Sequence, residues 1–150
     1  MSFTTWLFER RLKKNRLARK VDFPKYDDVK TVLVLLNDAM YEQNIVDFLG
    51  QDRKHVMVKY PPEKKQISFW TKKPAKEFLQ TISAHSYDIL LDLTSQETIP
   101  IQYMVLEARA AFRCGGYVKE GLFDMTILKT DSPMMLAQEI VHYLKEIKAK

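Results

Sequence analysis

The segment from Tyr87 to Tyr117 constrains the fold more than any other part of the sequence. It reads YDILLDLTSQETIPIQYMVLEARAAFRCGGY, which predicts a buried strand, a helix and a short strand that stops at two glycines. This order is a βαβ unit, and such units build parallel sheets through right-handed crossovers. Polar residues follow its first strand, at the edge where open α/β sheets usually bind ligands. The segment therefore predicts an α/β fold and locates a candidate ligand edge.

Alternating strand and helix patterns continue on both sides of this unit. The apolar, β-branched run Thr31–Leu36 is typical of a strand that is buried on both faces. A capping residue followed by proline, as at Ser132 and Pro133, predicts the start of a helix. The other predicted strands are His55–Tyr60, Ile67–Trp70, Ala111–Cys114 and Asp124–Leu128. We therefore expect a three-layer α/β/α Rossmann-like fold with a mostly parallel sheet of about five or six strands.

The size and composition of the chain are those of one folded domain. Its 150 residues include 46% hydrophobic side chains, which is enough for a single core. Its longest apolar runs are of strand length, whereas a membrane span needs about 20 residues. Charged residues from Glu9 to Arg11 interrupt any secretory signal, and a single cysteine, Cys114, fits a reducing compartment. We therefore expect a cytoplasmic protein.

Positive charge is concentrated at the amino terminus. The net charge is +5, but residues 1–20 hold seven basic side chains against one acidic, so the remainder of the chain is slightly negative. Attraction to an anionic partner is therefore expected only from this segment. We divide the chain into a basic N-terminal helix over 1–21, a linker over 22–30 and a single Rossmann-like domain over 31–150. The candidate residues for an anionic partner are Trp6, Arg10, Arg11, Lys13, Lys14 and Arg16.

Aromatic residues precede the basic run in this helix. At helical spacing Phe3, Trp6 and Leu7 share one side, whereas Phe8 and Leu12 lie on the opposite side. We expect the first set to dock on the domain itself or on a second subunit, which would make a homodimer. The alternatives are a protein partner and an anionic membrane surface, peripheral at the inner face. Nucleic acid is not expected, because the aromatic residues do not interleave with the basic ones.

Polar residues gather at the expected ligand edge. Asn37 and Asp38 follow the first strand, and Asp92, Thr94 and Ser95 follow the strand of the βαβ unit. If these strands are neighbours, the two carboxylates can serve as an acid and a base or hold a cation. We favour capping of the helices that follow, because Asp, Asn and Ser are preferred at the N-cap position. The edge therefore supplies candidates for ligand binding but no catalytic set.

No motif for a metal ion or a cofactor accompanies this edge. His55, His85 and His142 are scattered without the spacing of a zinc site. Gly115 and Gly116 lack the spaced glycines and the following helix start of a nucleotide-binding loop. We therefore expect no metal, no cofactor and a protein that is not an enzyme.

The run from Ser68 to Tyr117 resembles a known family. It contains Trp70, a helix, the strand YDILLDL, a helix that ends in alanines, and AAFRCGGY. This arrangement is similar to the N-terminal, acceptor-side domain of heptosyltransferase-type glycosyltransferases, which carry an aspartate–hydrophobic–aspartate strand, a helix and a short strand ending in glycine. The whole chain more closely resembles a group of short, uncharacterised bacterial α/β proteins with a basic N-terminal helix. The shared residues are mostly packing residues, so the resemblance implies architecture more than activity.

The chain departs from the transferase pattern where that pattern carries chemistry. Those enzymes bind the nucleotide-sugar donor largely through a second, C-terminal domain, and this chain ends where the first domain would end. Their catalytic aspartate lies in a glycine-containing loop. Here the corresponding loop, Leu35–Ala39, keeps Asp38 but has no glycine, which disfavours a cradled phosphate. Transfer activity by this chain alone is therefore not expected.

Two functions remain open from the sequence. We favour a non-catalytic binding or adaptor domain that uses its basic, aromatic N-terminal arm on a membrane surface, a protein partner or a second subunit. The alternative is a single-domain relative of glycosyltransferases that binds a sugar, a nucleotide sugar or a lipid-linked acceptor at the carboxyl edge of its sheet.

Overall fold

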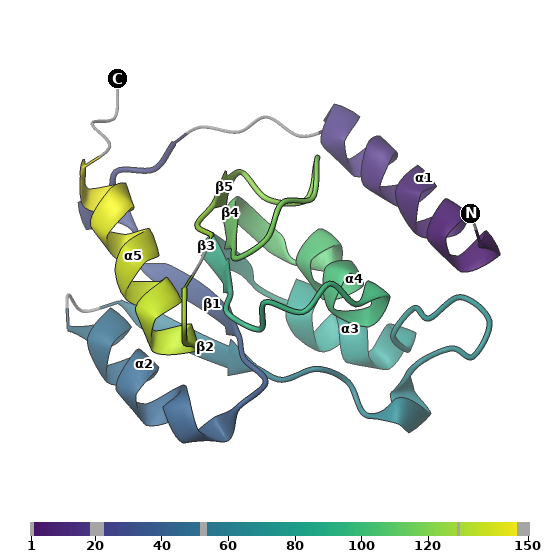
Figure 1. The fold of residues 1–150 in the computed structure, drawn as a ribbon, viewed down its shortest axis with the longest axis horizontal. Helices are drawn as coiled ribbons and strands as arrows, with labels where there is room; N and C mark the ends of the chain where they lie inside the picture. Colours follow the sequence, from purple (N-terminus) through teal and green to yellow (C-terminus); the bar gives the residue numbers. More distant parts are fainter. Residues whose placement is uncertain (1, 19–22, 52–53, 129, 147–150) are drawn as a thin grey trace.

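The computed structural model describes residues 2–18, 23–51, 54–128 and 130–146. Strands and helices alternate along the chain (Figure 1). The helices are α1 (Phe3–Ala18), α2 (Glu42–Gly50), α3 (Lys76–Ser83), α4 (Ile99–Glu107) and α5 (Pro133–Glu146). The strands are β1 (Thr31–Leu35), β2 (His55–Lys59), β3 (Ser86–Asp92), β4 (Arg109–Gly115) and β5 (Met125–Thr126). Short 3-10 helices lie in the connections: η1 (Tyr26–Asp28), η2 (Ala39–Tyr41) and η3 (Lys64–Gln66).

The strands form one parallel sheet in the order β2–β1–β3–β4–β5. β1 pairs with β2 from Thr31 opposite His55, and with β3 as far as Leu35 opposite Asp92. Because every pairing is parallel, the carboxyl ends of the strands meet at one edge of the sheet. This confirms the expected Rossmann-like α/β fold, and the strand order is one of the common doubly wound orders.

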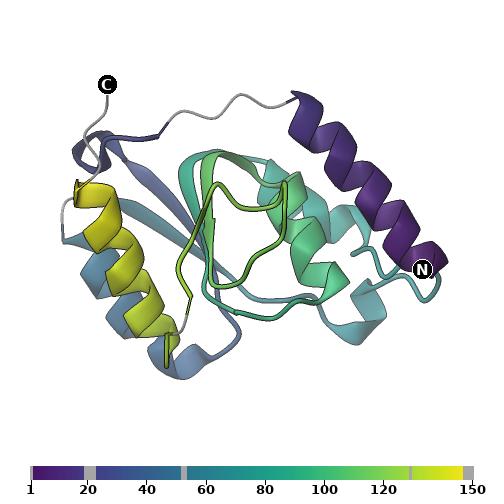
Figure 2. The ribbon, with the colours of Figure 1, turned by 45° about the horizontal axis from the view of Figure 1, so that its top comes forward.

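Helices cover both faces of the sheet (Figures 1 and 2). α2 and α5 pack on one face against Val34 and Leu91, whereas α3 and α4 pack on the other against Leu33 and Leu90. Successive residues of a strand point to opposite faces, which explains why β1 and β3 are apolar on both. α1 lies outside α4 and adds a further layer (Figure 1). Within the described residues, no helix combines the length and apolar character needed to cross a bilayer.

The prediction of a strand at Ile67–Trp70 is wrong. Only Ile67 forms a bridge, to Pro74 in antiparallel sense, and the chain turns between these two residues. Phe69 and Trp70 are among the most exposed side chains of the structure. β2 forms the edge of the sheet, and its described residues do not pair with this segment, which instead closes on itself through the Ile67–Pro74 bridge.

The last two strands differ in length from their predictions. β4 begins at Arg109 rather than Ala111, because it pairs with β3 from Ser86 opposite Arg109. Within Asp124–Leu128 only Met125 and Thr126 form a strand, since β5 is a short edge strand that pairs with the end of β4. The predictions for the first two strands are confirmed to within one residue.

The segment that precedes β1 packs on the domain. Tyr26 and Val29 are buried in the core beside α5. Lys54 is buried as well, and its Nζ donates hydrogen bonds to the carbonyl oxygens of Tyr26 (2.8 Å) and Val29 (2.6 Å). These contacts fix the entry into β1.

Candidate functional site

A crevice opens at the carboxyl edge, between the ends of β1 and β3. The chain leaves β1 toward α2 on one face of the sheet and leaves β3 toward α4 on the other, so this is the topological switch point of the fold. The crevice has a volume of about 430 Å³. Its lining is mainly polar and comprises Asn37, Asp38, Tyr41, Leu93, Thr94, Ser95, Thr130, Asp131, Ser132 and Pro133.

Two residues that line the crevice, Asp38 and Ser132, also cap the helices that follow them. Asp38 is the N-cap of η2, and its Oδ1 accepts a hydrogen bond of 3.0 Å from the backbone N–H of Met40. Ser132 plays the same part for α5, where its Oγ accepts from the N–H of Met135 (3.1 Å). The capping interpretation is therefore confirmed for Asp38 and Ser132. It is wrong for Asp92 and Ser95, because the N-cap residue of α4 is Thr98 and no side-chain hydrogen bond caps that helix.

Asp92, the last residue of β3, is fully buried. Its Oδ1 accepts hydrogen bonds from the N–H (3.0 Å) and the hydroxyl (2.5 Å) of Thr94, whereas its Oδ2 has no partner among the described residues. Burial raises the pKa of Asp92 to about 6, although both bonds from Thr94 act in the opposite direction. Asp92 does not line the crevice, so Asp38 and Asp92 do not present their carboxylates to one pocket.

The loop after β3 is held in an unusual conformation. Ser95 has a φ of 53°, in the left-handed region that non-glycine residues rarely occupy. It packs against Gly116 after β4, where a Cβ would lie 2.6 Å from Ser95 Oγ. Glycine at position 116 therefore lets the two loops approach each other at the crevice.

The N-terminal helix docks on the domain through the side opposite to the one predicted. Phe8 and Leu12 are buried, and the Phe8 ring packs edge to face on Tyr103 of α4 at a centroid distance of 5.1 Å. Phe3 and Trp6, which were expected to dock, are 63% and 47% exposed. The prediction was wrong because α1 has apolar residues all around, so helical spacing alone does not select a side.

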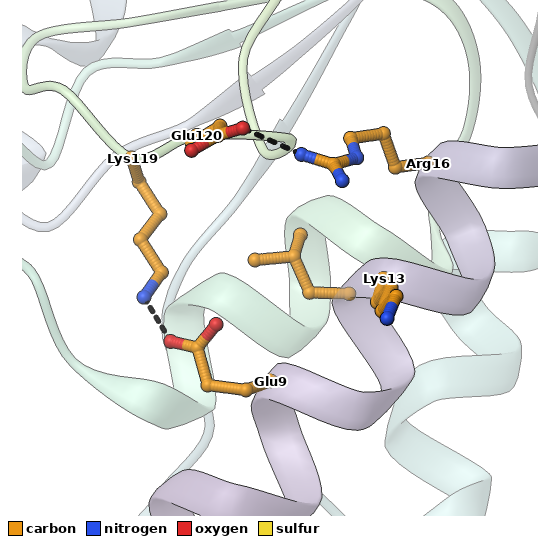
Figure 3. A pocket seen from close by; sticks show the side chains of 6 residues that line it. Glu9, Lys13, Arg16, Lys119 and Glu120 are labelled. Atoms are coloured by element: carbon orange, nitrogen blue, oxygen red, sulfur yellow. Dashed lines mark hydrogen bonds and ion pairs between the residues drawn. The ribbon is translucent and has the colours of Figure 1, made fainter.

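Polar contacts hold α1 along both flanks of this apolar seam. Arg11 pairs with Glu107 of α4 at 3.1 Å, and Arg113 of β4 donates to Asn15 at 2.9 Å. On the other flank Glu9 pairs with Lys119, and Arg16 pairs with Glu120 at 2.6 Å (Figure 3). A cleft of about 400 Å³ lies between these last two pairs.

The loop that carries Lys119 and Glu120 fits closely under α1. Gly121 follows Glu120 with a φ of 83°, and a Cβ there would lie 3.1 Å from Arg16 Cδ. Glycine thus allows both the left-handed turn and the passage of the Arg16 side chain.

The basic residues of α1 therefore separate into two groups. Arg11 and Arg16 are paired with the domain, whereas Arg10, Lys13 and Lys14 are exposed and form no ion pair within the described residues. Arg19 and Lys20 lie outside the described residues. The exposed cations share the outer side of α1 with Phe3 and Trp6, whose rings stack at 6.1 Å, and the Arg10 guanidinium lies 5.6 Å from the Trp6 ring. We call Phe3, Trp6, Arg10, Lys13 and Lys14 the outer face of α1.

A family model matches residues 2–147, which is nearly the whole chain; its description is a family of unknown function, DUF6913. The chain belongs to the DUF6913 family. The DUF6913 match spans α1 as well as the sheet, so the outer face and the crevice both lie within the matched region. No curated protein and no solved structure matches the chain.

Sequence reasoning missed one pair of candidate residues. Phe69 and Trp70 were assigned to a strand, yet they are 76% and 78% exposed on a turn beside the start of α1. The available signal was composition: this aromatic pair lies between two lysine pairs, Lys64–Lys65 and Lys72–Lys73, with no alternation of apolar and polar residues.

Proposed function

We propose that this DUF6913 protein binds the surface of anionic membranes peripherally, through the outer face of α1. The observation that carries the proposal is the distribution of side chains on the helix: Arg11 and Arg16 pair with the domain, whereas two aromatic rings and three exposed cations, which form no ion pair within the described residues, lie on the outer face. Trp and Phe favour the membrane interface, and each Lys or Arg near an anionic surface contributes about 1 kcal/mol. Apolar area together with basic charge is the combination by which interfacial helices bind anionic membranes reversibly.

Docking of α1 leaves this function available. Phe8 and Leu12 satisfy the apolar contacts with the domain, so the outer face meets the bilayer without any rearrangement of the helix. An acidic protein partner or a nucleic acid could also bind the cations of the outer face. The stacked Phe3–Trp6 pair near the amino end of the helix favours a surface with an apolar layer beneath its charges.

Replacing Arg10, Lys13 and Lys14 together with glutamine is expected to weaken binding to vesicles at least tenfold, on the order expected for three lost cations. Co-sedimentation with vesicles of phosphatidylcholine and phosphatidylserine measures this. Binding of the wild-type protein should fall as salt is raised, and it should require phosphatidylserine.

The matched control removes the same charge elsewhere. Lys25 and Lys30 flank η1, Lys145 lies near the end of α5, and all three are exposed. α5 and the segment that contains η1 pack together on the far side of the molecule from the start of α1 (Figure 1), so the triple glutamine variant of these lysines should bind as the wild type does. Equal binding by the two triple variants would contradict the proposal, because only net charge would then matter. Wild-type protein that stays in the supernatant at low salt would contradict it outright.

We propose as a second function that the crevice binds a neutral, polyhydroxylated ligand such as a sugar. Its position at the switch point supports this, since doubly wound sheets bind ligands there. The lining offers carboxylates, an amide, hydroxyls and the ring of Tyr41, and its described residues include no cation. That set suits hydroxyl groups better than phosphate.

Thermal unfolding in the presence of monosaccharides, disaccharides and nucleotide sugars tests the crevice. A sugar that binds is expected to raise Tm by about 2 °C or more at saturating concentration. Asn37→Ala and Asp131→Ala should abolish that increase, while Asp27→Ala, an exposed aspartate in η1, should keep it. If no sugar raises Tm, or if all three variants respond alike, the crevice is not a sugar site.

A further inference from the structure

The turn that carries Phe69 and Trp70 is an exposed aromatic tip that is closed by backbone hydrogen bonds. Backbone hydrogen bonds from Ser68 to Lys73 (2.9 Å), from Lys72 to Ser68 (2.9 Å) and from Ala75 to Gln66 (2.6 Å) close it. The two rings pack edge to face at 5.4 Å, and the Lys72 ammonium lies 5.2 Å from the Phe69 ring. The turn is therefore a defined structure with its apolar side chains directed at solvent.

No other large apolar side chains in the described structure are more exposed than this pair. Phe69 and Trp70 are 76% and 78% exposed, although burying an aromatic side chain typically contributes about 1.5–3 kcal/mol. A closed turn that displays two such rings is typical of a contact surface. Lys72 is exposed beside the Phe69 ring, so the surface combines apolar area with positive charge.

The tip is joined to the start of α1. Thr4 Oγ1 donates a hydrogen bond of 2.9 Å to the carbonyl oxygen of Trp70, although 66 positions separate the two residues. Both views of the fold place the turn between β2 and α3 beside the amino end of α1 (Figures 1 and 2). The four exposed rings of Phe3, Trp6, Phe69 and Trp70 therefore lie at the same end of the molecule.

We propose that the 66–75 turn is a second membrane-inserting element, which enters the interface of an anionic bilayer together with Phe3 and Trp6. This inference rests on the proposed function of the outer face of α1 and adds a segment that the sequence pattern did not indicate. The bilayer is preferred over a second copy of the chain as the occupant. The exposed Lys72 lies beside the Phe69 ring and joins the cations of α1 at this end of the molecule, and two identical positive surfaces would repel each other.

The chain has two tryptophans, Trp6 and Trp70, so each segment carries its own fluorescent reporter. Trp6→Phe leaves Trp70 as the only tryptophan, and Trp70→Phe leaves Trp6. On vesicles of phosphatidylcholine and phosphatidylserine, the emission of Trp70 is expected to shift to shorter wavelength and to be quenched by lipids with brominated acyl chains. Phe69→Ser with Trp70→Ser should weaken co-sedimentation about tenfold or more.

The control variant removes equally exposed apolar side chains elsewhere. Met40 and Val118 are 72% and 71% exposed, and Met40→Ser with Val118→Ser should bind vesicles as the wild type does. If Trp6 responds to vesicles but Trp70 does not, the turn does not insert and only this inference falls. If the wild-type protein binds no vesicles, both proposals fall. A dimer in solution that Phe69→Ser with Trp70→Ser converts to a monomer, without vesicle binding, would assign the turn to a second copy instead.

Discussion

Replacing Phe8 with alanine is expected to lower the free energy of unfolding by about 3–5 kcal/mol, the range for a fully buried phenylalanine. Phe8 is 1% exposed and packs edge to face on Tyr103. Its ring joins α1 to the core on the α3 and α4 face, so its loss removes the apolar contact that seats the helix. Denaturant unfolding followed by circular dichroism measures the change.

Phe3 provides a matched control within the same helix. It is the same residue type but 63% exposed, so Phe3→Ala should change the free energy of unfolding by no more than about 0.5 kcal/mol. A similar, small effect of both substitutions would mean that α1 separates from the domain before the sheet unfolds. The effects on vesicle binding should have the opposite order: Phe3→Ala should weaken binding although it has little effect on the free energy of unfolding.

Replacing Asp92 with asparagine is expected to stabilise the protein at neutral pH by up to about 3 kcal/mol. Burial raises the pKa of Asp92 from 3.8 to about 6, and Oδ2 has no hydrogen-bond partner among the described residues. Between these two pKa values the folded state binds more protons than the unfolded state, so the stability of the wild type falls as pH rises through this range. Asparagine keeps an oxygen for Thr94 and removes the buried charge.

The pH dependence separates this effect from simple repacking. The difference in unfolding free energy between Asp92→Asn and the wild type should be small near pH 4, grow up to about pH 6 and then stay constant. Other titrating groups are common to both proteins, so they cancel in the difference. A constant difference at every pH would show that the asparagine acts through packing rather than through the charge.

The sheet was predictable from the sequence because the burial of its central strands is evident from their own residues. Nearly every position is apolar in Thr31–Leu35 and Ile89–Leu91, and such continuous apolar runs are typical of strands that are covered on both faces. The helix caps were equally local, as Asp38 and Ser132 confirm. The length of the two-residue strand β5 was overestimated, because the local sequence of an edge strand does not show how many of its residues pair with the neighbouring strand.

The docking side of α1 could not be predicted from local spacing. The side is selected by Tyr103, Glu107, Lys119 and Glu120, whose side chains are about a hundred positions away in the sequence. Each of these contacts depends on the fold of the rest of the chain. The same holds for Asp92, whose place at a strand end was evident but whose burial depends on the elements packed around it.

The two ion pairs between α1 and the 117–122 loop have opposite polarity. At one end the helix supplies the acid, Glu9, and at the other it supplies the base, Arg16. If the helix lay end for end in the same seam, Glu9 would meet Glu120 and Arg16 would meet Lys119, so both contacts would become repulsive. The two ion pairs therefore favour one of the two possible orientations of α1 in the seam. This orientation keeps the aromatic end of α1 beside Trp70. The opposite polarity of the two ion pairs, rather than the strength of either one, therefore determines where the aromatic rings and the cations of α1 lie on the molecule.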